Sequence, residues 1–243
     1  MTPSLPLLLA LALLAAGSAP ESAPSPVSSE AATLRNLGLA QLENERPAEA
    51  AATFRKLAQL APGDPLPYAN LAIAALRQQK SEEAQSWIAQ ALTRAPGRAD
   101  LLMIQGDVLQ WSGQDEEALA AYRKAAAAAP DRVDLQYSLY RQAAQLSGPE
   151  AEAALADALK SLARLRPENL VVLLQAGQRA IAAGDRAGAT RAFLRVRELA
   201  GTASPAASAA LGPVMAALES GDVAAARVPA IRLENVLKPT APY

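Results

Sequence analysis

Carboxylates are among the residues of this chain that could do chemistry, whereas the sequence contains neither cysteine nor histidine. Thiolate nucleophiles, Ser-His-Asp triads, imidazole acids and bases, and zinc sites of the usual Cys/His kind are therefore excluded. Carboxylate pairs remain at Glu82/Glu83 and Glu116/Glu117. Both pairs stand where we expect helices to begin, and a carboxylate there complements the positive end of the helix. A glycosidase would need two carboxylates facing each other across a cleft, and nothing in the sequence arranges that.

Sequence motifs for phosphate, dinucleotide and metal sites are also absent. There is no GxxxxGK[ST] loop, no strand-linked GxGxxG, no HExxH and no GxSxG. The 23 basic and 24 acidic residues are spread along the chain, so no basic face indicates a nucleic-acid surface. We therefore expect a protein that is not an enzyme, binds no cofactor or metal, and does not bind nucleic acid.

Side chains suited to contacting another protein stand in the middle of the chain. Tryptophan, tyrosine and arginine are frequent anchors of protein interfaces, and methionine adapts to irregular partners. Because aromatic residues make up only 4 % of the chain, Met103, Trp111 and Tyr137 stand out from the surrounding sequence. Whether they share one surface depends on the elements that carry them.

Those elements are predicted to be helices in an internal repeat. Apolar residues make up 51 % of the chain, and most are alanine and leucine, which favour helices. A step of 34 residues places proline on proline, small on small and large on large residues. The matched columns are Pro62, Pro96 and Pro130; Ala50, Ala84 and Ala118; Phe54, Ile88 and Tyr122; Leu57, Ala91 and Ala125; Gly38, Ala72 and Gly106; and Leu34, Tyr68 and Leu102.

Each unit therefore predicts two helices whose apolar faces meet, with Leu34, Leu37 and Gly38 facing the second helix of the first unit. The column of prolines ends the second helices, and Asp64-Pro65 predicts an N-cap followed by proline at the first helical position. Ser81 and Asp115 are predicted to cap two of the second helices.

The period continues toward the C-terminus with one slip. The next proline, Pro167, comes 37 residues on, so we expect three extra residues in the fourth unit, near 145–153. Beyond it, Gly177 falls on the glycine column and Phe193 on the large one. The Gly184-Asp185 pair recurs 37 residues later, which indicates a sixth pair of helices. Pro229 is predicted to kink or shorten its second helix.

This pattern resembles the tetratricopeptide repeat family over roughly residues 31–236. The resemblance implies an all-α fold, a right-handed α-solenoid of five to six helix-turn-helix repeats, whose first helices line a concave groove. Three columns of the first helices would face that groove. They are Arg35, Ala69, Met103, Tyr137 and Leu174; Leu39, Ile73, Asp107, Arg141 and Gln178; and Glu43, Arg77, Trp111, Gln145 and Ala182.

The resemblance also implies that the groove binds a partner protein. The predicted binding residues are Arg35, Ile73, Arg77, Met103, Asp107, Trp111, Tyr137 and Arg141. Two interpretations of this patch remain open: either it receives an extended or helical segment of another protein, or Trp111 and Tyr137 pack against neighbouring units and the charges are only solvated. Trp87 is expected to pack between helices and has no functional role.

The N-terminal residues predict export. An apolar run from Leu5 to Ala16 followed by small residues suits a secretory signal peptide over residues 1–18, and is too short to span a bilayer. Residues 19–29 are predicted to be a flexible leader rich in proline, serine and alanine. The repeat domain would occupy residues 30–236, with a tail at 237–243.

The predicted function is that of a non-catalytic interaction scaffold that binds a peptide or helix of a partner protein. We expect it in the periplasm or outside the cell, assisting assembly of an envelope or secretion complex. The alternatives are a cytoplasmic location, or an inner-membrane tether through an uncleaved N-terminal segment. The alternative function is a structural component that self-associates or caps a larger assembly through its convex face or its terminal helices.

Overall fold

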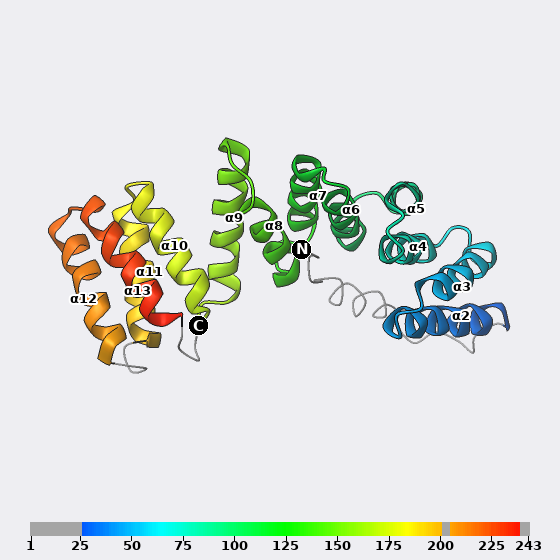
Figure 1. The fold of residues 1–243 in the computed structure, drawn as a ribbon, viewed down its shortest axis with the longest axis horizontal. Helices are drawn as coiled ribbons and strands as arrows, with labels where there is room; N and C mark the ends of the chain where they lie inside the picture. The colour runs from blue at the N-terminus through cyan, green and yellow to red at the C-terminus, as the bar shows by residue number, and fades with distance from the viewer. Residues whose placement is uncertain (1–25, 201–204, 239–243) are drawn as a thin grey trace. The chain divides into compact units, whose positions relative to one another are not determined.

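A computed structural model describes residues 26–200 and 205–238 of the chain. This part consists of helices and connecting turns, which form two compact units that divide after Ala129 (Figure 1). In the described part of unit 1 the helices are α2 (Pro26–Glu43), α3 (Pro47–Leu60), α4 (Pro65–Arg77), α5 (Ser81–Arg94), α6 (Ala99–Trp111) and α7 (Asp115–Ala128). In that of unit 2 they are α8 (Val133–Ala143), α9 (Pro149–Leu165), α10 (Leu170–Ala182), α11 (Arg186–Ala200), α12 (Pro205–Ser220), the 3-10 turn η1 (Ala224–Ala226) and α13 (Arg227–Leu237).

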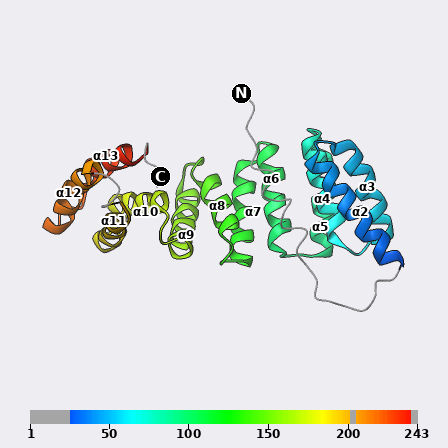
Figure 2. The same cartoon turned by 90° about the horizontal axis from the view of Figure 1, so that it is seen from below.

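The helices pair in sequence order, as the repeat predicted. Each odd-numbered helix packs against the even-numbered helix before it, and in unit 1 each new pair also packs on the previous second helix (Figure 2). The described residues hold twelve α-helices, hence six pairs of helix-turn-helix form. The prediction of an all-α fold with five to six such repeats is confirmed.

The two helices of a pair approach closely because a small residue on the first helix meets a large one on the second. A Cβ built on Gly38 would lie 2.6 Å from the ring of Phe54. Gly106 lies as close to Tyr122, and Gly177 meets Phe193 in the same way. All three rings are fully buried. In the second pair, Ala72 and Ile88 occupy the same columns. The isoleucine side chain is smaller than the phenylalanine and tyrosine rings of the same column, so it leaves room for the methyl group of Ala72.

The turn within each pair also repeats. In every pair one turn residue has a positive φ, and these residues are Glu45, Gln79, Gly113, Gly148, Gly184 and Gly221. In the third pair, Gly113 N–H donates to Gln110 O (3.0 Å), and Gln114 N–H donates to Leu109 O (2.9 Å). These two bonds satisfy carbonyl groups that the end of α6 leaves free, as in a Schellman-type helix end.

The predicted helix caps are correct at one position and wrong at two. The Asp64 carboxylate accepts a hydrogen bond from Leu66 N–H (2.9 Å), and Pro65 is the first residue of α4. Ser81 and Asp115, however, are the first helical residues of α5 and α7, one position after the N-cap. The N-caps there are Lys80 and Gln114, and neither side chain makes a capping hydrogen bond.

One predicted boundary moves. Residues 26–29, predicted to end the leader, form the first turn of α2, where proline at the first helical position is well tolerated. The slip in the fourth pair lies where it was predicted: α9 has 17 residues where α7 has 14, and its extra residues are at its N-terminal end. The predicted signal peptide lies outside the described residues. Within the described residues, no helix is long and apolar enough to cross a membrane.

Leu37 does not pack as predicted. Its side chain is exposed, whereas Leu71, 34 residues on, is buried in the core of unit 1. The physical reason is position in the array. Helix α4 packs against α3 of the preceding pair, but α2 is the first helix that the structure describes. An internal repeat has a neighbour on both sides, whereas among the described residues α2 packs mainly against α3.

The last pair departs from the pattern of the others. Its second helix is divided into η1 and α13, and Pro229 lies in the first turn of α13 rather than inside it. A proline there breaks no helical hydrogen bond, because the first amide groups of a helix have no intrahelical acceptor. Helix α13 packs on its own partner α12 and also on α10, the first helix of the preceding pair.

Candidate functional site

The predicted binding residues of unit 1 divide into exposed and buried ones. Trp111, the last residue of α6, has a side chain 44 % exposed. Ile73 and Met103, by contrast, are only 2 % and 6 % exposed. The prediction that these two line an open surface is wrong. Alanine and leucine are so frequent in the first helices that their apolar faces are wider than the contact between two helices requires, and the sequence pattern cannot separate the inner face from the core.

Two of the charged residues predicted in unit 1, Arg77 and Asp107, are engaged with their own unit. Arg77 donates to the backbone oxygen of Leu42, and burial lowers its pKa while the carboxylate of Glu45 opposes that shift. Asp107 accepts a hydrogen bond from the hydroxyl of Tyr122 (2.6 Å), so it ties α6 to α7. Arg35 is half-buried on α2. Asp107 therefore has a structural role, whereas two nitrogen atoms of Arg77 have no acceptor among the described residues.

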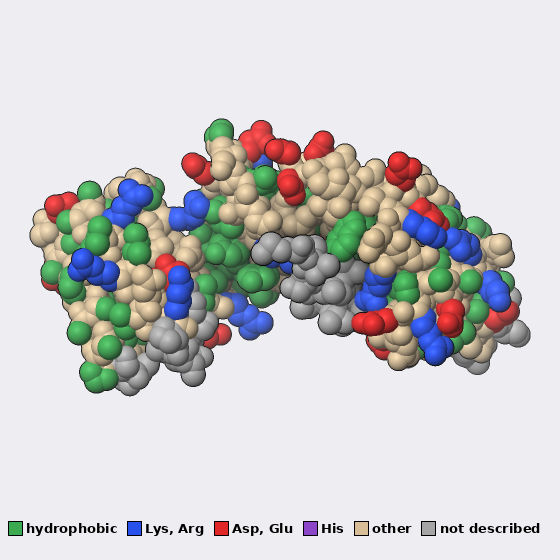
Figure 3. All heavy atoms as spheres, in the orientation of Figure 1, with side chains coloured by type: hydrophobic (Ala, Val, Ile, Leu, Met, Phe, Trp, Pro, Cys, Tyr) green, Lys and Arg blue, Asp and Glu red, His purple; other side chains and the backbone are tan. Residues whose placement is uncertain are grey.

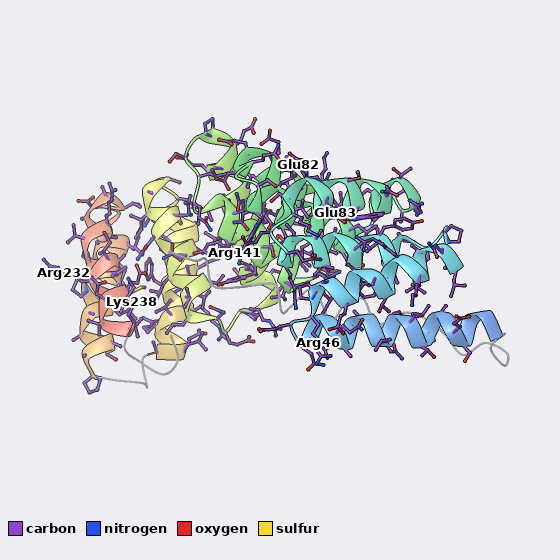
Figure 4. All side chains as sticks on the ribbon, turned by 45° about the vertical axis from the view of Figure 1, so that its right-hand side comes forward. Arg46, Glu82, Glu83, Arg141, Arg232 and Lys238 are labelled. Atoms are coloured by element: carbon purple, nitrogen blue, oxygen red, sulfur yellow. The ribbon has the colours of Figure 1, made fainter. Side chains whose placement is uncertain are left out.

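The carboxylate pair Glu82/Glu83 lies at the start of α5 (Figure 4). Glu83 accepts from the indole N–H of Trp87 (3.2 Å) and from Arg55 (2.9 Å). These bonds, the one from Trp87 first, lower the pKa of Glu83. The side chain is thus an ionised acceptor that links α3 and α5. Trp87 also stacks at a tilt on Tyr68, with ring centroids 6.2 Å apart, which fits the packing role predicted for it.

In unit 2, Tyr137 and Arg141 both lie on α8. Tyr137 is the more exposed of the two predicted aromatic anchors, at 56 %. Its ring lies 6.0 Å from that of Tyr140, centroid to centroid. Burial raises the pKa of Tyr140, Tyr137 and Glu234 raise it further, and Arg179 lowers it. Residues of α8, α10 and α13 therefore share one electrostatic environment. Arg141 is half-buried, and its Nε has no acceptor among the described residues (Figure 4).

Helix α13 lies on the face of α10 that was predicted to line the groove. Gln178, from the second predicted column, donates to Glu234 Oε2 (2.9 Å) and to the backbone oxygen of Ala230 (3.4 Å). Gln175 donates to the other oxygen of Glu234 (3.4 Å). In the fifth pair the inner face is thus partly covered by the chain's own last helix.

Beside this contact is a pocket of about 340 Å³ between α10 and α13. Its lining residues are Gln175, Gln178, Arg179, Ile181, Ala182, Arg227, Ala230 and Ile231. Gln178 and Ala182 belong to the predicted groove columns. Arg179 directly follows Gln178 in the sequence, so its place beside the predicted groove could have been inferred from the sequence. Arg227 and Ile231 had no such signal, because the approach of α13 to α10 is a contact about 50 residues apart in the chain.

On the face that Figure 3 shows, both units carry hydrophobic and charged side chains side by side. Within the described residues, no group of three or more aspartate and glutamate side chains gathers as a metal site would require. The arrangement offers exposed aromatic rings, arginine side chains and the small mixed pocket between α10 and α13. These features suit non-covalent binding of a polypeptide.

Comparison with known proteins supports the fold. Residues 41–108 match the tetratricopeptide repeat family. The structure is similar to that of MamA (residues 41 to the end) from Desulfovibrio magneticus RS-1, with 24 % sequence identity, a TM-score of 0.52, and coverage of 71 % of this chain and 96 % of MamA. It is also similar to PilF of Pseudomonas aeruginosa, with 18 % identity, a TM-score of 0.55, and coverage of 90 % of this chain and 97 % of PilF.

A third similar structure is YrrB, described as a tetratricopeptide repeat protein with an unusual peptide-binding site. It shows 15 % identity and a TM-score of 0.50, and the match covers 68 % of this chain and 83 % of YrrB. No sequence among the curated proteins matches the chain. At these identities the similarities establish the fold, an all-α array of tetratricopeptide-like helix pairs.

Proposed function

We propose that this protein is a non-catalytic scaffold that binds a segment of a partner protein through the first helices of its repeats. The observation that carries the proposal is the exposure of two large aromatic side chains, Trp111 and Tyr137, on first helices. The fold supports it, because stacked helix pairs present extended surfaces for binding. The peptide-binding site named for YrrB is in keeping with it.

An exposed tryptophan or tyrosine is an effective binding anchor for a physical reason. Each ring offers a large apolar area and only two rotatable side-chain bonds, so its burial by a partner gains much and loses little conformational entropy. Truncation of such anchors typically costs about 2 kcal/mol or more, which is about 30-fold in affinity. Truncation of these rings should leave the stability of the fold unchanged, because neither ring is in the core.

The test is crosslinked capture from the native cell envelope with the wild type and the Trp111→Ala/Tyr137→Ala variant. We expect at least one protein to be lost from the captured set while the helical content and unfolding midpoint stay unchanged. A matched control is Leu60→Ala, which removes an exposed apolar side chain from α3, a second helix. An unchanged captured set would refute binding at the first helices. Global unfolding of the double variant would place both rings in the core instead.

We also propose that the chain is exported and acts in the periplasm or outside the cell, where it would assist assembly of an envelope or secretion complex. The apolar run from Leu5 to Ala16 and the small residues that follow it, within the predicted signal peptide of residues 1–18, support this location. The measurement is the mass of the mature protein together with cell fractionation. An intact N-terminus in the cytoplasmic fraction would exclude export.

A second candidate function is self-association through the last pair of helices. It is favoured by two large apolar side chains on α13, Val228 and Ile231, that are exposed. Sedimentation velocity over a wide concentration range distinguishes it from the scaffold proposal. A dimer that Val228→Glu dissociates would support self-association, and a monomer at every concentration would exclude it.

A further inference from the structure

The pocket between α10 and α13 combines positive charge with an apolar wall. Arg179 comes from α10 and Arg227 from the first position of α13, and they are the two charged residues among those that line it. Within the part of the chain that the structure describes, neither guanidinium lies within 4.0 Å of a carboxylate oxygen. The remaining lining residues are two glutamines and four apolar residues.

Glu234 of α13 is bonded to two glutamines that line the pocket, and its carboxylate is already engaged. One oxygen accepts from Gln178 and the other from Gln175, and Lys238 lies 3.4 Å from the latter. Glu234 itself does not line the pocket. Its carboxylate therefore holds α13 on α10, and the two arginine side chains are left to interact with a group from outside.

The apolar side of the pocket is open to a ligand. Ile231, 47 % exposed, and the exposed Ala182 offer apolar surface there, while Ile181 and Ala230 lie buried behind them. A volume of about 340 Å³ is at the small end of the roughly 300–1,000 Å³ of ligand sites. The pocket therefore suits part of a peptide better than a larger ligand.

We propose that this pocket binds an acidic peptide segment of the partner protein, with a carboxylate side chain between Arg179 and Arg227 and an apolar side chain against Ile231. Arginine is suited to this task because its planar guanidinium donates two parallel hydrogen bonds to one carboxylate. Helix α13 supplies one wall of the site, so the last pair of helices is part of the binding surface. The proposal rests on the scaffold function and specifies which partner chemistry it recognises.

The experiment uses the full chain and two fluorescein-labelled octapeptides. One contains six glutamates and two leucines, and the other replaces every glutamate with glutamine. Fluorescence anisotropy is recorded for the wild type, for Arg179→Gln/Arg227→Gln, and for Arg232→Gln. Arg232 is a matched control, since it is an exposed arginine of the same helix that projects outward and does not line the pocket (Figure 4).

We expect the glutamate peptide to bind the wild type and the glutamine peptide not to bind. The double variant should weaken binding about tenfold or more, and Arg232→Gln should leave it unchanged. Binding should also weaken as salt is added. Absence of binding to the glutamate peptide, or an equal loss with Arg232→Gln, would overturn the proposal.

The two proposals fail in different ways. If capture of the cellular partner depends on Trp111 and Tyr137 but not on Arg179 and Arg227, the scaffold function stands and the acidic-peptide site is refuted. If peptide binding depends on the arginine pair while capture is unaffected by loss of the aromatic rings, the first-helix surface of the scaffold proposal is refuted.

Discussion

Substitution of Gly38 by alanine tests the packing rule that brings the two helices of each pair together. The new Cβ would lie 2.6 Å from two ring atoms of Phe54, a distance at which one of the groups must move. Phe54 is fully buried, so its ring has no open space to enter. Overpacking of this kind costs about 1–3 kcal/mol. Replacement of glycine by alanine in a helix gains about 1 kcal/mol, which offsets part of that cost.

Because the buried ring of Phe54 cannot move away, the cost of overpacking should fall in the upper part of the range of about 1–3 kcal/mol. We therefore expect Gly38→Ala to lower the free energy of unfolding by about 1–2 kcal/mol. For a chain of this size the melting temperature should fall by about 2–8 °C. The assay is urea and thermal denaturation followed by circular dichroism at the helix band. Gly63→Ala is the control, since no atom lies within 4 Å of the added methyl group there, and its effect should stay within about 0.5 kcal/mol.

A second substitution makes the test specific. The double variant Gly38→Ala/Phe54→Ile reproduces the alanine and isoleucine of the second pair, Ala72 and Ile88, which are both buried. We expect Phe54→Ile alone to be destabilising and the double variant to be more stable than the sum of the two single changes by at least about 1 kcal/mol. Additive effects, or an increase in stability for Gly38→Ala alone, would refute the reasoning.

Three further predictions concern single residues. Asp64→Ala removes the one predicted cap that the structure confirms, and denaturation should show a loss of about 1 kcal/mol; no loss would mean that the Leu66 amide finds another acceptor. Gln79→Gly should raise stability by up to about 1 kcal/mol, because residue 79 has the positive φ that glycine adopts freely; destabilisation would show that the Gln79 side chain matters more. The hydrogen bond from Trp87 lowers the pKa of Glu83, so its small contribution to stability is present above the ordinary glutamate pKa and is lost as the pH falls through the lowered value. The indole N–H resonance of Trp87 should shift with a midpoint below the ordinary glutamate range, and a midpoint at or above it would contradict the assignment.

Burial could be predicted from the sequence for the small residues of the repeat columns, whereas the groove-facing positions were predicted less well. Ala72, Ala84 and Ala118 are fully buried, as their columns indicated, and each lies on a helix that packs against the other helix of its pair. For Trp111 the sequence left two interpretations open, a groove surface or packing against a neighbouring unit, and its side chain is 44 % exposed. Ile73 and Met103 were predicted beside it and are buried, since a helix in the middle of an array is contacted on more sides than one apolar stripe suggests.

The sequence by itself determined the helix pairs and their packing contacts. The contacts between Gly38 and Phe54, Gly106 and Tyr122, and Gly177 and Phe193 join residues 16 apart. Such contacts follow from helical period and side-chain volume, which are local properties of the chain.

Only the tertiary structure decided what covers each face. The hydrogen bonds from Gln178 to Ala230 and Glu234 span more than 50 residues. These bonds connect α13 to α10, and the pocket lined by Arg179 and Arg227 lies between the two helices. A periodic pattern shows that a helix has a face to bury or present, but it does not name the segment that will meet it, because that contact depends on how the last pair docks on the others.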